Sequence, residues 1–171
     1  MEFLSKVDKI ILHHTKTTYD HPYLIKLRHK LLRWWDDIWY HFIIGNGIFS
    51  IDWKLYHWRD LLFQGAHVFW QNSDSIGISL IWDFDLYKPS LKQLDTLYTL
   101  LIKLIKEYNI AIENVLWHSD FNNEKSCPGK NLNLNIIRNE VFQLLNDNIS
   151  SMVSNDVSCN EIKHRRLELR V

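Results

Sequence analysis

Short apolar runs alternate along this chain with longer segments whose apolar positions have helical spacing. The clearest run is residues 75–82, SIGISLIW, and its near-continuous apolar character is typical of a central strand covered on both faces. Shorter runs of the same kind predict strands at residues 10–13 and 114–117. A fourth strand is expected at residues 38–44, which are dense in aromatic and β-branched side chains.

The segment that follows residue 44 predicts a hairpin. A Gly-Asn-Gly sequence at 45–47 has the composition of a tight turn. Residues 48–51 are therefore expected to return beside 38–44 as the second strand of the hairpin. A further short strand is expected at residues 55–58.

Three segments predict helices. Residues 22–32 have apolar side chains at helical spacing and a proline in the first turn. The pattern after residue 90 predicts a longer helix, and Ser90 with Gln93 forms a plausible capping box at its start. Residues 133–145 again place apolar side chains three and four positions apart.

Strands that alternate with helices predict a single α/β domain over residues 1–149, in which a central mixed sheet is flanked by helices. Residues 150–171 turn polar and then basic, and they are expected to form a weakly ordered tail or an appended short helix.

Composition narrows the possible functions. The 171 residues carry 20 basic and 20 acidic side chains, so the formal net charge is zero and binding to nucleic acid by bulk electrostatics is disfavoured.

No apolar stretch is long enough for a membrane span or a secretory signal, which predicts cytoplasmic synthesis and release by lysis or another export route. We expect a monomer. Eight Trp indicate stacking surfaces as well as core.

Each candidate metal ligand ends a predicted strand or lies in the loop after one. These residues are the pair His13-His14, His118 after the strand at 114–117, and Cys127 in the following polar loop. Two imidazoles and one thiolate suit zinc, and three protein ligands leave a fourth position open, as in catalytic sites. Taken alone, the same residues also fit a surface histidine pair and a buried free cysteine.

Five segments in order carry a family resemblance: ILHHTKT, YHFIIGNG, GAHVFWQNSDSIGISLIWDFD, WHSD and KSCPGKNL. Together they resemble the zinc-dependent N-acetylmuramoyl-L-alanine amidases of the second type. That family includes the peptidoglycan recognition proteins and the amidase-type lysozymes of phages. The resemblance extends from about residue 9 to about residue 145. It implies a peptidoglycan recognition protein-like fold and hydrolysis of the amide between N-acetylmuramic acid and L-alanine in peptidoglycan or muropeptides.

The resemblance also implies roles for individual residues. It places one Zn²⁺ per chain on His13, His118 and Cys127. It makes Tyr40 and Lys125 the catalytic pair, since both suit donation to a tetrahedral oxyanion and one of them suits proton transfer to the leaving amine.

Two further residues are candidate substrate contacts. His67 lies where the family has a groove residue, and Asn72 precedes the predicted central strand, with a role in a turn as the alternative for Asn72. Strand alternation gives His14 a structural role on the opposite side from His13. The chain departs from the family by placing large rings where the family usually has glycine, at Trp39, Trp58, Trp70 and Trp82.

Two other functions remain open on the sequence. One is a module that binds peptidoglycan without cutting it, although an intact set of three ligands speaks against this. The other is a phage-type amidase that also binds and regulates a cytoplasmic protein partner.

Overall fold

A computed structural model describes residues 2–33 and 39–147. Its centre is a five-stranded sheet in the order β3-β2-β4-β1-β5, in which β3 is antiparallel to β2 and all other neighbours are parallel. The strands are β1 (Lys9–His14), β2 (Phe42–Ile44), β3 (Leu55–His57), β4 (Ser75–Leu80) and β5 (Val115–Trp117). The predicted mixed sheet in a single α/β domain is confirmed.

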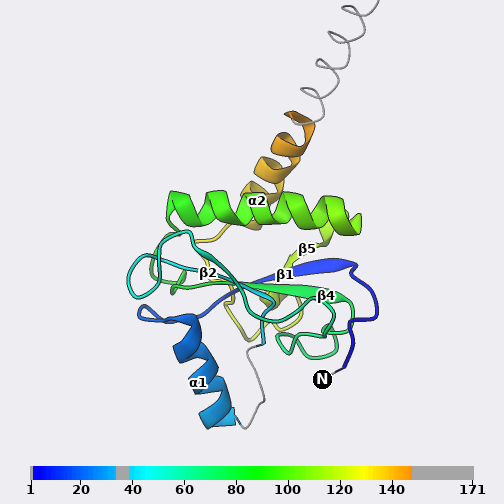
Figure 1. The fold of residues 1–171 in the computed structure, drawn as a ribbon. Coiled ribbons are helices and arrows are strands. Elements are labelled where there is room, and N and C mark those ends of the chain that lie inside the picture. The colour runs from blue at the N-terminus through cyan, green and yellow to red at the C-terminus, as the bar shows by residue number, and fades with distance from the viewer. Residues whose placement is uncertain (1, 34–38, 148–171) are drawn as a thin grey trace, which may run out of the picture.

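Helices cover both faces of the sheet, as Figure 1 shows. They are α1 (Pro22–Arg33) and α2 (Leu91–Tyr108), with the 3₁₀ turns η1 (Ile112–Asn114) and η2 (His118–Asp120) on either side of β5. Residues 134–147 are also helical, up to the end of the described chain. Each of the three predicted helices is present, and the predicted tail at 150–171 lies outside the described residues.

The two faces of the sheet carry different layers. Every second residue of the central strands, such as Leu12 and Ile78, packs with Leu97 and Leu101 of α2 into the main hydrophobic core. The opposite face, toward α1, has a small buried hydrophobic cluster of Ile25, Ile43 and Ile81. Because side chains alternate along a strand, neighbouring residues of β1 point to opposite layers.

The local sequence signals explain the most regular elements. β4 is buried at all six positions, as expected for the central strand of a parallel sheet. The capping box at the start of α2 is present, with the Ser90 side chain accepting from the Gln93 backbone N–H and the Gln93 side chain accepting from the Ser90 backbone N–H. Among the described residues, no helix is both long and apolar enough to cross a membrane.

The predicted hairpin is wrong in its second strand. Residues 48–51 form no strand, and β3 instead pairs with β2, with Ile44 opposite Leu55. The reason is local: the Asn46 side-chain oxygen accepts from the backbone N–H of Ile48 and from the Ser50 hydroxyl. Such side-chain to backbone bonds compete with a strand ladder, so the chain makes a longer loop before it returns.

The predicted strand at 38–44 is shorter than expected. Residue 38 lies outside the described residues, and β2 begins only at Phe42. The backbone of His41 still bonds to both neighbouring segments, since its N–H donates to Gly77 at 2.9 Å and its carbonyl accepts from Trp58 at 2.9 Å.

Candidate metal centre and active site

Parallel strand pairing brings two candidate ligands to one edge of the sheet. In β1 and β5, Leu12 lies opposite Trp117, so His13 and His118 both follow at the carboxyl ends of adjacent strands. His13 points to the α1 face and is 1% exposed. The third ligand comes from a loop, whose Cys127 carbonyl accepts from the Ser119 backbone N–H at 2.9 Å.

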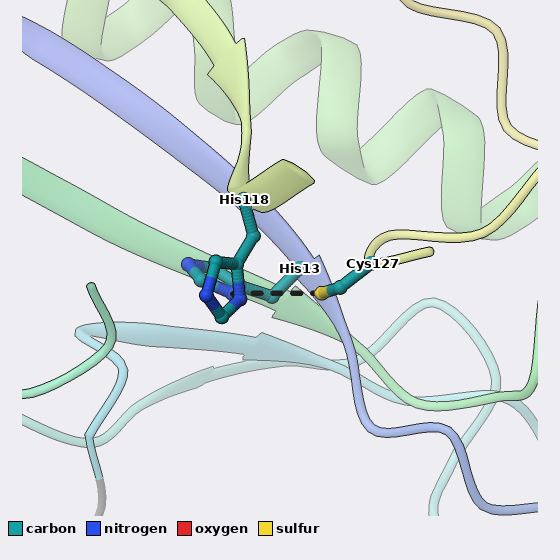
Figure 2. A group of neighbouring side chains, drawn as sticks. All are labelled: His13, His118 and Cys127. Atoms are coloured by element: carbon teal, nitrogen blue, oxygen red, sulfur yellow. Dashed lines mark hydrogen bonds between the residues drawn. The ribbon is translucent and has the colours of Figure 1, made fainter. Parts of the chain in front are cut away.

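Figure 2 shows the His13, His118 and Cys127 side chains converging on one point. The Nδ1 atoms of the two histidines are 3.1 Å apart, and the Cys127 sulfur lies 3.7 Å from the His13 Nδ1. All three candidate ligand atoms lie within 4.8 Å of one another. A tetrahedral zinc ion with ordinary bond lengths separates two nitrogen ligands by about 3.3 Å and a nitrogen from a sulfur by about 3.6 Å. The observed spacing therefore fits such an ion.

The electrostatics of the three side chains suit a cation. Burial is the main cause that lowers the pKa of His13 well below 6.5, and it lowers that of His118 to about 4. Both imidazoles are therefore neutral at pH 7, with lone pairs available. Burial raises the pKa of the Cys127 thiol to about 11, so a thiolate at this position requires a nearby positive charge.

The loop that carries Cys127 is fastened by one carboxylate. Asp85 accepts a hydrogen bond from the Ser126 hydroxyl at 2.5 Å and from the Lys130 backbone N–H at 3.3 Å. It also pairs with Lys16 at 3.2 Å. These contacts tie the loop on both sides of Cys127 to the segment after β4 and to the segment after β1.

His67 lies against the candidate ligand His13. Its Nδ1 is 3.1 Å from the His13 Nε2, and its own Nε2 is 3.4 Å from the Ser75 hydroxyl. The ring is 5% exposed and lies between Gly65 and Gly77, where an added Cβ would come within 2.4 and 2.5 Å of it. The sequence predicts His67 as a substrate contact, but most of its contacts in the structure are to the protein interior. The two glycines on either side are the sequence signal for this packed ring.

Tyr40 and Lys125, the candidate catalytic pair, each lie near one of the two candidate histidine ligands. The Tyr40 ring centroid is 5.0 Å from that of His13, and the half-buried Tyr40 packs against the small cluster that includes Ile43. Lys125 is exposed, and its charge contributes, after burial, to the lowered pKa of His118.

A cavity of about 330 Å³ opens beside His118. Its walls combine aromatic rings with amide and charged side chains, from Trp39, Ala66, His67, Val68, Phe69, Asn72, His118, Phe121, Asn122 and Lys125. Asn72 is therefore at the cavity, as a substrate contact requires. The Asn72 side-chain oxygen, however, accepts hydrogen bonds from the backbone N–H groups of His67 and Val68 at 2.9 and 3.0 Å. These bonds give Asn72 the role in a turn that the sequence offers as the alternative.

Two other histidines have structural contacts. His14 is 5% exposed, points to the α2 face, and accepts a hydrogen bond from the Phe84 backbone N–H at 3.2 Å, which confirms its predicted structural role. The His41 Nδ1 accepts from the Gly77 N–H at 3.0 Å, so its Nε2 carries the proton and donates to the Phe63 carbonyl at 3.0 Å.

Comparison with known proteins relates this geometry to one family. The family model described as N-acetylmuramoyl-L-alanine amidase matches residues 4–130. Peptidoglycan-recognition protein LB of Drosophila melanogaster is 30% identical over 148 residues, which is 81% of this chain. The match spans 61% of that relative, so the chain corresponds to about three-fifths of its length.

Solved structures of the same kinds of protein are also similar to this chain. The N-acetylmuramoyl-L-alanine amidase LysC from Clostridium intestinale URNW superposes with a TM-score of 0.72 at 28% identity, over 80% of this chain and 85% of that one. Drosophila PGRP-LB superposes with a TM-score of 0.64 at 27% identity, over 77% and 80% of the two chains. These similarities include both named amidases and named recognition proteins.

Proposed function

The chain belongs to the N-acetylmuramoyl-L-alanine amidase family, and we propose that it is a zinc hydrolase that cleaves the amide between N-acetylmuramic acid and L-alanine in peptidoglycan or muropeptides. The observation that carries this proposal is the convergence of His13, His118 and Cys127 within 4.8 Å, beside Tyr40 and Lys125. The named amidase LysC, similar over 80% of this chain, supports it.

His13, His118 and Cys127 are the residues that would hold the zinc ion. The spacing of their ligand atoms and the neutral state of both imidazoles support this assignment. The chemistry that zinc supplies when bound by three protein ligands is polarisation of a carbonyl and activation of water.

Tyr40 and Lys125 would act on the charge that develops at the reacting carbonyl. Attack of water on the lactyl amide gives a tetrahedral oxyanion, which needs hydrogen-bond donors. The Tyr40 hydroxyl and the Lys125 ammonium are such donors, since Tyr40 contacts the His13 ring and Lys125 lines the cavity beside His118. One of them would also deliver a proton to the leaving amine of L-alanine.

A module that only binds muropeptide is the main alternative function, because the similar proteins include recognition proteins. Binding alone needs no half-buried thiol beside two neutral imidazoles, and partial burial of these polar groups without a metal is costly. The complete ligand set therefore favours the enzyme.

The experiment is digestion of purified peptidoglycan by the full chain, with mass spectrometry of the released products. We expect free stem peptides that begin with L-alanine, and intact glycan strands. A chelator, or the variant Cys127→Ala, should abolish their release. Binding of peptidoglycan without release of peptides by the zinc-loaded protein would support the binding module instead.

A further inference from the structure

Two neighbouring aromatic side chains stand out of the surface beside the candidate active site. Phe69 is 79% exposed and Trp70 is 83% exposed, and their ring centroids are 4.8 Å apart at an angle of 60°. Phe69 lines the cavity that also contains His118 and Lys125. Exposed rings that adjoin a cavity of this kind indicate a binding surface.

The loop that carries the two rings is fixed to the candidate metal centre. Asn72 accepts from the backbone N–H groups of His67 and Val68, and the Gln71 N–H donates to the Val68 carbonyl at 3.1 Å. The Gln71 side chain in turn accepts from Lys9 Nζ at 2.7 Å, at the start of β1. Since His67 contacts His13, the rings keep a set position relative to the candidate ligands. Such preorganisation lowers the entropy cost of binding.

The backbone conformation of Trp70 indicates that its side chain does not stabilise the fold. Its φ is 65°, in the left-handed region that a bulky side chain rarely adopts without strain. A ring that is 83% exposed recovers little of this strain through burial. Strained residues cluster at binding and catalytic sites, and Trp70, unlike Trp53, adjoins the cavity beside His118 through its contact with Phe69.

The surroundings of the rings select a sugar as the ligand. One face of a pyranose ring is rich in C–H groups and packs on an aromatic ring, while its hydroxyl groups need polar partners at the edge. Phe69 and Phe121 supply rings in the cavity, and Asn122 and Lys125 supply polar groups. Two aromatic side chains bury only about 300–500 Å², which is less than the roughly 800 Å² per partner of a stable protein interface.

We propose that Phe69 and Trp70 form a stacking platform for the glycan strand of peptidoglycan. The sugar that carries the cleaved amide would lie in the cavity beside His118, and the next sugars along the strand would stack on Phe69 and Trp70. This proposal rests on the proposed function, because it takes its ligand from the same substrate.

The experiment measures binding of the full chain to glycan strands from which the stem peptides have been removed. The test variants are Trp70→Gly and Phe69→Ala. Glycine adopts a φ of 65° without strain, so Trp70→Gly should fold at least as stably as the parent protein. The matched control is Trp53→Gly, because Trp53 has a φ of 66° and is 52% exposed, but lines a different cavity beside α2.

We expect each test variant to bind the stripped strands about tenfold more weakly, which corresponds to about 1.4 kcal/mol. Trp53→Gly should bind as the parent protein does. The fluorescence change of the parent protein on binding should also be lost in Trp70→Gly. Equal affinity of parent and Trp70→Gly, or an equal loss in Trp53→Gly, would overturn the platform.

Failure of the proposed function is a separate result. If the zinc-loaded protein releases no peptides from peptidoglycan but Trp70→Gly still loses affinity for stripped strands, the platform stands and the amidase activity does not. If peptides are released and stripped strands bind equally to parent and Trp70→Gly, only the platform fails.

Discussion

Replacing His67 by leucine should weaken zinc binding although His67 is not a ligand. When His13 binds a metal through Nδ1, its ring proton must be on Nε2, which faces the His67 Nδ1 at 3.1 Å. The His67 Nδ1 then accepts a hydrogen bond from this N–H, the His67 Nε2 donates to the Ser75 hydroxyl, and Ser75 donates to the Gln71 carbonyl. Leucine has no acceptor, so His67→Leu leaves a buried N–H of His13 without a partner.

The size of the effect follows from the burial of this pair. His13 is 1% exposed and His67 is 5% exposed, so water has little access to the orphaned N–H. A buried donor without a partner costs about 1–3 kcal/mol, which is about 5- to 150-fold in an equilibrium constant. Without metal, the His13 proton can move to Nδ1, so the cost falls mainly on the metal-bound state. We therefore expect zinc affinity to fall about 10- to 100-fold, as for other partners of metal-bound histidines.

Competition with a chromophoric chelator measures this affinity directly, and the metal-induced rise in melting temperature gives a second reading. The matched control is His67→Asn, which has nearly the shape of leucine but places an acceptor near the former Nδ1. Asparagine should restore most of the lost affinity. If the leucine and asparagine variants bind zinc equally, or if the leucine variant binds zinc as tightly as the parent protein, His67 does not position His13.

Three further predictions concern catalysis, pH and the loop of Cys127. Tyr40→Phe and Lys125→Ala should each retain zinc but lower kcat by about a hundredfold or more, the usual cost of one oxyanion donor; unchanged steady-state rates in both would refute their role. Burial lowers the pKa of His41 from 6.5 to about 4, so the unfolded state binds the extra proton between these values. The free energy of unfolding of the metal-free protein should therefore fall as the pH drops from 6.5 to 4, by about 3 kcal/mol from His41 alone, and urea titrations of His41→Gln should show a flatter profile. Gly129→Ala should destabilise the fold by about 1–3 kcal/mol and weaken zinc binding, because Gly129 has a φ of 101° and a Cβ there would lie 2.6 Å from the Phe84 backbone; an unchanged urea midpoint would contradict this.

The fold was predictable from the sequence where local and long-range signals agree. The apolar run of β4 fixes a buried central strand, and the capping box at Ser90 fixes the start of α2. The loop after β2 was not predictable in the same way, because the side-chain bonds of Asn46 replace the expected hairpin turn. A turn composition indicates that the chain reverses, but it does not give the length of the loop.

The candidate site was predictable as a set of residues but not as a network. Strand ends and the family resemblance single out His13, His118 and Cys127, and the structure brings these three together. The contact between His67 and His13 depends on which ring nitrogens face each other, and the sequence contains no signal for that. The role of Asp85, which holds the loop on both sides of Cys127, likewise depends on long-range packing.

The most direct test of the metal centre is X-ray absorption at the zinc edge of the loaded full chain, compared with Cys127→Ala. We expect one zinc per chain with one sulfur at about 2.3 Å and two imidazole nitrogens at about 2.0–2.1 Å, and loss of the sulfur signal in the variant. A zinc environment without sulfur in the parent protein, or a sulfur signal that survives Cys127→Ala, would contradict it.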